Sequence, residues 1–122
     1  MLGLWILSEH GLVLYHACKD GSIDAHLFAG FLSAANTIAM QLDDDGLGGI
    51  ELGTTRITIS RSRGLLFIGL HDKRVKEKRV AADMRAVTGK FFSMYPPAVI
   101  DGWNGNARAF AAFDQVAAIT IE

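Results

Sequence analysis

The segment between residues 56 and 79 carries the most concentrated charge in the chain. Only Asp72 and Glu77 oppose its basic residues, so the segment has a net charge of about +6 and the rest of the chain about −7. A cationic surface of this kind attracts acidic proteins, anionic lipids or phosphate groups. The basic residues are Arg56, Arg61, Arg63, Lys73, Arg74, Lys76, Lys78 and Arg79.

The stretch from residue 73 to residue 79 lies where a helix is expected to begin. Cations at a helix N-terminus cost roughly a few tenths of a kcal/mol each, so their presence favours a binding function. The structural alternative is a solvated helix face with Asp72 as its N-cap, because charge runs often only solvate a helix. Both interpretations stay open at this stage.

Other residues that could bind a metal or a phosphate do not have the spacing that such sites require. Asp43, Asp44, Asp45 and Gly46 lack the alternating oxygen ligands and terminal Glu of an EF-hand loop, so we expect a flexible acidic loop. Residues 46–49 are glycine-rich but do not form a phosphate-binding motif. We therefore expect no metal and no cofactor.

The histidines and the single cysteine do not form a recognisable catalytic set. His10, His16, His26 and His71 show no metal-ligand spacing. Cys18 lies at the end of a predicted strand, where a small buried thiol is common. We expect no enzyme. Trp103, in a polar loop, is either a plug beneath the last helix or an exposed anchor for a partner.

The periodicities of the chain define the elements that carry these residues. Extended patterns cover residues 2–7 and 12–16, and a long amphipathic helix covers 24–42. Three more extended runs cover 50–52, 56–61 and 65–70, with a hairpin turn at 62–64. Helices over 75–95 and 107–119 follow. The face of the first helix expected to pack on the sheet consists of Leu27, Phe28, Phe31, Leu32, Ala35, Ile38, Ala39 and Leu42.

The strands differ in a way that predicts their positions. The first and last are continuously apolar, which is typical of strands covered on both faces. The run at 56–61 alternates and belongs nearer an edge. We therefore predict an α/β (α+β) fold in three layers, α-β-α, with a five-stranded antiparallel sheet and the order ββ-α-βββ-α-α.

Size and composition limit the remaining possibilities. The 122 residues, half of them hydrophobic, predict a single domain over residues 1–122. No apolar run approaches the roughly 20 residues that cross a bilayer. One cysteine allows no internal disulfide and favours a reducing compartment. We expect a cytoplasmic protein, with peripheral membrane contact as an open alternative.

The element order and strand character resemble those of longin domains, the SNARE-like branch of the profilin-like folds. Small subunits of clathrin adaptors and TRAPP subunits are relatives of this kind. The resemblance implies that the first and fifth strands are central, that the first helix covers one face, and that the last two cover the other. Roadblock domains begin with a helix, whereas this chain begins with strands.

The resemblance implies a non-enzymatic interaction module: a scaffold, adaptor or regulator linked to small Ras-like GTPases and vesicle trafficking. Its expected partner is such a GTPase or another longin or roadblock-type domain, in a homo- or heterodimer formed at a sheet edge. The basic block lacks interleaved aromatic residues, so we expect no nucleic acid. A small-molecule sensor and an anionic-membrane-binding module are the alternatives. The candidate binding residues are the eight basic residues and Trp103.

Overall fold

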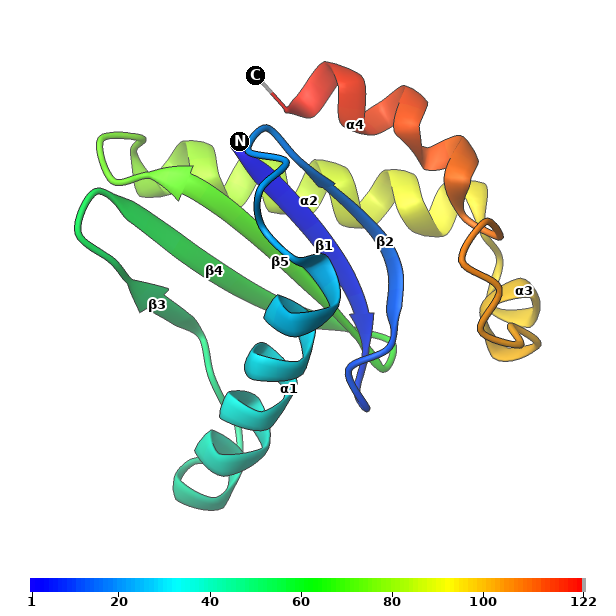
Figure 1. Cartoon of the computed structure of the whole chain (residues 1–122), viewed down its shortest axis with the longest axis horizontal. Coiled ribbons are helices and arrows are strands. Elements are labelled where there is room, and N and C mark those ends of the chain that lie inside the picture. The colour runs from blue at the N-terminus through cyan, green and yellow to red at the C-terminus, as the bar shows by residue number, and fades with distance from the viewer. Residues whose placement is uncertain (122) are drawn as a thin grey trace.

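The computed structural model describes residues 1–121 and has the predicted order of elements. The chain opens with a β-hairpin, continues into a long helix, adds three strands, and ends in helices (Figure 1). The elements are β1 (Gly3–Ser8), β2 (Val13–Cys18), α1 (Ala25–Leu42), β3 (Gly49–Glu51), β4 (Thr55–Ser62), β5 (Leu65–Asp72), α2 (Glu77–Met94), α3 (Pro97–Asp101), a 3-10 turn (Ala111–Phe113) and α4 (Asp114–Thr120).

The five strands form one antiparallel sheet in the order β2-β1-β5-β4-β3. The continuously apolar strands β1 and β5 lie side by side in its centre, with Trp5 opposite Ile68. Both strands are buried along almost their whole length, because helices cover both of their faces. The predicted central pair and the predicted position of β4 next to an edge are confirmed.

Helices cover the two faces of the sheet unequally. Alternate residues of β1 and β5 point to opposite sides, so Trp5 and Ile68 face α1, while Ile6 and Phe67 face α2 and α4. Figure 1 shows α1 on one side of the sheet and α2 with α4 on the other. The predicted three-layer arrangement is confirmed.

Two local features fix the α2 side of the sheet. At Gly69 an added Cβ would lie 2.6 Å from the sulfur of Met84, so glycine lets α2 approach β5 closely. The β4–β5 connection is a tight turn in which Arg63 and Gly64 both have positive φ, as a two-residue type I′ hairpin requires. The predicted hairpin at 62–64 is therefore confirmed.

The predicted packing face of α1 is wrong in part: Leu32 is buried and Phe28 packs against the sheet as predicted, but Leu27, Phe31, Ile38 and Leu42 are exposed. The residues that α1 buries are Ala25, Ala29, Leu32 and Asn36. Small side chains face the sheet because the sheet is already bulky there, with Trp5 at its centre. The helix therefore lies close to the strands, and most of its large apolar side chains point elsewhere.

The helix ends also differ from expectation. Lys76, not Asp72, is the N-cap of α2, and it makes no side-chain capping bond. Asp72 instead accepts a 2.9 Å hydrogen bond from the backbone N–H of Arg74, which forms a turn before the helix. The short helix α3 was not predicted, and the predicted helix 107–119 becomes a turn, a 3-10 segment and α4. Among the described residues, no helix has the length and apolarity to cross a membrane.

Candidate functional site

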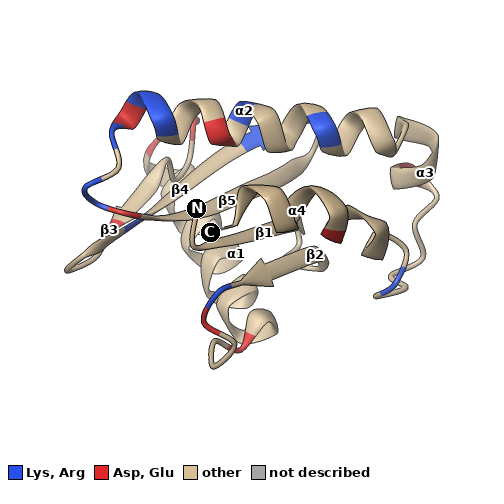
Figure 2. Ribbon diagram, turned by 90° about the horizontal axis from the view of Figure 1, so that it is seen from above, with Lys and Arg blue, Asp and Glu red and all other residues tan. Residues whose placement is uncertain are grey.

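The predicted basic block does not form one surface. Figure 2 shows most of its cations where α2 begins, interleaved with acidic residues. Arg61 and Arg63 lie at the other end of β4 from Arg56. At 3.3 Å per residue along the strand, Arg56 and Arg61 are about 16 Å apart. Trp103 follows α3 and is remote from both in sequence. We call the larger group the basic end; it consists of Arg56, Lys73, Arg74, Lys76, Lys78 and Arg79.

Carboxylates neutralise much of the basic end. Glu51 on β3 accepts from Arg56 Nε at 2.6 Å and also lies 3.3 Å from Lys73 Nζ. Arg79 lies 3.3 Å from Asp83, one helical turn along α2. Six cations therefore face four carboxylates, Glu51, Asp72, Glu77 and Asp83, which leaves a net charge of about +2. The charge of +6 counted along the segment therefore overstates the net charge of the surface that a partner contacts.

Hydrogen bonds stabilise the charged forms of two of these acids. Bonds from the side chain and backbone of Arg74 lower the pKa of Asp72 to about 2. Bonds from Arg56, and then Lys73, lower the pKa of Glu51. Lys76 and Lys78 are exposed, and within residues 1–121 neither makes a salt bridge. These two lysines are the cations of the basic end most available to an acidic partner.

The remaining predicted binding residues have structural contacts. Arg61 donates to Asn36 of α1 and, at 2.7 Å, to the carbonyl of Leu47, so it fastens the loop after α1. The Arg63 guanidinium lies 4.7 Å from the centre of the Phe92 ring. Trp103 is half-buried against Phe110, as the plug interpretation expected. Their roles in binding stay predictions.

The surface that sequence reasoning missed lies on α1. We call it the α1 stripe and define it as Leu27, Phe31, Ile38 and Leu42, which are 74%, 58%, 61% and 87% exposed. At about 100° per residue these side chains point away from the buried face of Ala25, Ala29, Leu32 and Asn36. A row of large apolar side chains on a solvent-exposed helix is typical of an interaction surface.

The composition of α1 could have revealed this stripe. No Asp, Glu, Lys or Arg occurs in its 18 residues, so the helix has no charged face to turn toward solvent. The apolar periodicity alone predicts that the large residues pack on the sheet. In fact Ala25 and Ala29 face the sheet, which leaves the larger residues outside.

One of the two edges of the sheet is β3, which follows α1 along the chain. β3 pairs with β4 on one side only, so its other side has unpaired backbone groups. The loop between α1 and β3 is fixed to the helix, because Leu47 N–H donates a 3.1 Å hydrogen bond to Asn36. In Figure 1, α1 lies between the β1–β2 hairpin and β3.

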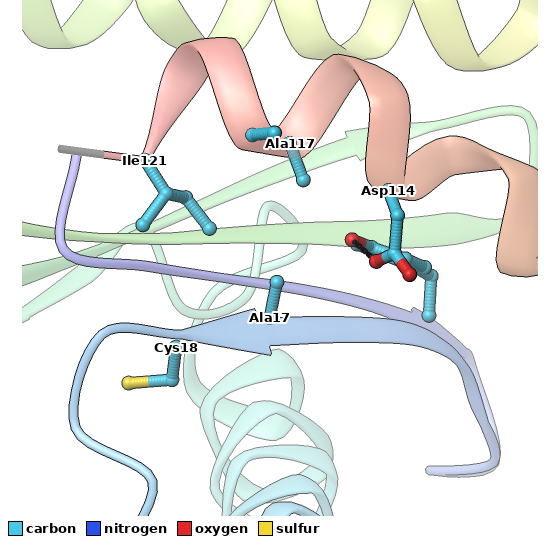
Figure 3. Close-up of a pocket in the computed structure, with 7 residues that line it drawn as sticks. Ala17, Cys18, Asp114, Ala117 and Ile121 are labelled. Carbon is cyan, nitrogen blue, oxygen red and sulfur yellow. Dashed lines mark hydrogen bonds between the residues drawn. The ribbon is translucent and has the colours of Figure 1, made fainter.

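A shallow apolar pocket lies between β2 and α4 (Figure 3). Ala17 and Ile121 point into it, whereas Cys18 points to the opposite side of β2. The Tyr15 hydroxyl donates a 2.5 Å hydrogen bond to Asp114 at one end of the pocket. Burial, and then this hydrogen bond, raise the pKa of Tyr15.

One ionisable pair is buried beneath α2. His71 is 1% exposed, and its Nε2 lies 3.0 Å from Asp83 Oδ2, while its Nδ1 has no partner among the described residues. This depth keeps His71 from meeting a substrate. Residues 1–121 contain no group of three His, Cys, Asp or Glu side chains placed to hold a metal ion.

Comparisons with known proteins bear on the fold. No family model matches the chain, and no curated protein matches it. A Roadblock/LC7 domain from Streptomyces avermitilis superposes with a TM-score of 0.56 at 19% identity, covering 73% of this chain and 83% of that one. Myxococcus xanthus MglB superposes with a TM-score of 0.56 at 14% identity, covering 75% and 84%.

The chain has a longin-like fold. The expected fold is confirmed by these superpositions, while the longin label itself stays a prediction. The chain begins with strands, as expected, yet about three quarters of it superpose on Roadblock domains. The expected distinction from that group therefore concerns the order of elements and not the sheet.

Proposed function

We propose that this protein is a non-enzymatic interaction module that acts as a scaffold, adaptor or regulator of a small Ras-like GTPase. The α1 stripe supports the interaction role in this proposal, because four large apolar side chains on an uncharged helix are unfavourable in water and gain from a protein partner. The longin-like fold supports the GTPase link that the longin resemblance implies. We place the protein in the cytoplasm or at the membrane periphery, in vesicle traffic.

The two surfaces suit different contacts. The α1 stripe is apolar and suits a stable contact with another apolar surface. The basic end carries Lys76 and Lys78, which are exposed and form no salt bridge with any described residue. It therefore suits the acidic rim of a partner, which would accelerate association. We assign the GTPase to the basic end.

The test is binding to purified small Ras-like GTPases, each loaded with GDP or with a non-hydrolysable GTP analogue. Binding is measured by surface plasmon resonance at two salt concentrations. We expect at least one GTPase to bind in one nucleotide state and to bind more weakly at high salt, since exposed charges are screened. Equal failure of all GTPases in both states contradicts the proposal.

A matched pair of variants locates the contact. Lys76→Glu with Lys78→Glu reverses the charge of two exposed lysines, and we expect roughly tenfold weaker binding, mostly through slower association. Arg85→Glu with Lys90→Glu makes the same charge change at two exposed positions about 14 Å and 21 Å along α2 from Lys76 at 1.5 Å per residue, and is the control. If the two double variants weaken binding equally, net charge and not the basic end is responsible.

A further inference from the structure

We infer that the outer edge of β2 binds an extended segment of a different protein, which pairs with β2 as an added strand and carries an apolar and a basic side chain two residues apart. This edge lies across the sheet from β3, and the contact uses neither the α1 stripe nor the basic end. The inference therefore goes beyond the proposed function and assigns a second kind of partner.

The backbone of β2 has hydrogen-bonding groups that no strand covers. β2 is the outermost strand on its side of the sheet and pairs only with β1. Across this pair, the N–H of Lys19 donates a 2.9 Å hydrogen bond to the carbonyl of Leu2. Because inward and outward residues alternate along an antiparallel pair, Ala17 also bonds inward, while the N–H and C=O groups of His16 and Cys18 point outward. These two residues offer four backbone groups to an added strand.

The edge of β2 lacks the features that usually keep an exposed strand from pairing. Charged residues, proline and a very short length are common protections of this kind. β2 has six residues and contains no Asp, Glu, Lys, Arg or Pro. Its register shift lies near the β1–β2 turn, between Val13 and Tyr15, so the pairing is regular from Tyr15 to Cys18. The strand β3, in contrast, has only three residues and includes Glu51.

Two pockets beside β2 provide places for the side chains of an added strand. The pocket between β2 and α4 has a volume of about 280 Å³ (Figure 3). Its apolar lining includes Ala17, Ala117, Ala118 and Ile121. A second pocket, of about 200 Å³, lies along residues 13–16 and is lined by both His26 of α1 and Asp114 of α4. In strand addition, main-chain hydrogen bonds supply affinity, and pockets for alternate side chains supply specificity.

Asp114 determines which charge the added strand carries. It lines both pockets, and no other Asp, Glu, Lys or Arg among residues 1–121 lines either of them. One carboxylate oxygen accepts the Tyr15 hydroxyl, and within the described chain Asp114 forms no salt bridge. Along α4, Asp114 and Ala118 are about 6 Å apart at 1.5 Å per residue, close to the roughly 6.6 Å between alternate residues of a strand. A basic and an apolar side chain two residues apart match this spacing.

A second copy of this chain does not supply the matching strand. Neither of its edge strands, β2 or β3, contains a Lys or Arg to meet Asp114. Pairing of β2 with β2 of a second copy would also bring two Asp114 carboxylates to one edge, where like charges repel. The occupant that fits is therefore a segment of another protein.

Peptide binding followed by NMR tests the inference. The probe is acetyl-Thr-Val-Leu-Thr-Lys-Val-Thr-amide, and a matched peptide has Glu in place of Lys. Titration of the isotope-labelled chain with up to about 1 mM probe, enough to detect millimolar affinity, should shift the amide signals of His16 and Cys18. Hydrogen exchange of these two amides should slow roughly fivefold, because both N–H groups become bonded. The Glu peptide should bind roughly tenfold more weakly.

Two variants locate the contact. Asp114→Asn keeps an acceptor for the Tyr15 hydroxyl but removes the charge, so it should abolish the preference for the Lys peptide over the Glu peptide. Ala118→Phe fills the pocket between β2 and α4 and should weaken binding of the probe roughly tenfold. Ala86→Phe, the same change at an exposed position of α2, is the matched control and should leave binding unchanged. Circular dichroism checks that each variant is folded.

The outcomes separate this inference from its alternatives. Unchanged signals of His16 and Cys18 in the titration overturn it, as do equal affinities of the wild-type chain for the two peptides. If both amides are protected from exchange in the free chain and lose that protection on dilution, a second copy occupies the edge and the inference is wrong. Failure of every GTPase to bind contradicts only the proposed function, because the peptide assay contains no GTPase.

Discussion

Tyr15 connects the edge strand β2 to the last helix, and its ionisation should influence stability. Its hydroxyl donates to Asp114, and burial raises its pKa above the ordinary value of 10.0. The neutral form is therefore favoured more in the folded than in the unfolded state. Its contribution to stability is complete below pH 10 and is lost as the pH rises through the folded-state pKa.

We predict that the free energy of unfolding falls as the pH rises above 10, and that Tyr15→Phe makes this fall shallower. Some dependence should remain, because burial also raises the pKa of Tyr95. At neutral pH the same substitution should cost about 1 kcal/mol, the usual value of one hydrogen bond. Urea unfolding of both proteins from pH 8 to about pH 11 measures these effects. Identical pH profiles for the two proteins would exclude this role for Tyr15.

Arg61 provides a second test at the residue scale. Its guanidinium bonds to Asn36 and to the Leu47 carbonyl, so Arg61→Ala should lower the free energy of unfolding by about 1–3 kcal/mol. Partner binding by the folded variant should be unchanged. Thermal melting and the GTPase binding assay measure the two properties. If the variant has normal stability but does not bind, Arg61 belongs to the interaction surface and this prediction is wrong.

Sequence alone cannot distinguish such an arginine from Lys78. Both belong to one basic stretch, but Arg61 points toward α1 and Lys78 toward solvent. The acids that neutralise the basic end include Glu51 and Asp83, which lie outside the stretch or further along α2. Pairing of this kind depends on how the strands align, and spacing along the chain does not reveal it.

At the scale of elements, α2 begins without a capping side chain. Lys76 occupies the N-cap position, where Asp, Asn or Ser would accept a bond from the helix N-terminus. We predict that Lys76→Asp raises the free energy of unfolding by about 1 kcal/mol and also weakens partner binding. Thermal melting and the binding assay measure the two effects.

Lys76→Ala is the matched control for this prediction, because it removes the same cation and supplies no hydrogen-bond acceptor. It should weaken binding without the gain in stability. If Lys76→Asp stabilises the protein and leaves binding intact, the uncapped start of α2 has no function in binding.

The two long helices show when a periodic pattern is sufficient. The predicted face of α2 is largely correct, since Val80, Met84, Val87 and Phe91 are buried. In α2 the exposed face is charged, so only one face of the helix is apolar enough to pack on the sheet. In α1 no charges mark the outer face, and two apolar faces compete for the sheet. The bulk of Trp5 on the sheet favours the face with alanines, and no helical wheel contains that information.

For the whole molecule, strand character was the most informative signal. The continuous apolar runs of β1 and β5 predicted a central pair covered on both sides, and the alternation in β4 predicted its place near an edge. The position of a strand in the sheet determines which of its faces are buried, and the pattern of apolar residues reflects that burial. Surfaces that bind other proteins are harder to predict from the sequence, because an interface helix and a core helix have similar apolar patterns in an isolated chain.

The molar mass in solution tests most directly whether the α1 stripe is a protein interface. Size-exclusion chromatography with light scattering should give the wild-type chain about 26 kDa, twice its 13.2 kDa, at about 100 μM, where micromolar affinities suffice for pairing. Phe31→Glu with Leu42→Glu should give 13.2 kDa with an unchanged circular dichroism spectrum. A wild-type mass of 13.2 kDa, or a variant that stays dimeric, would contradict the account.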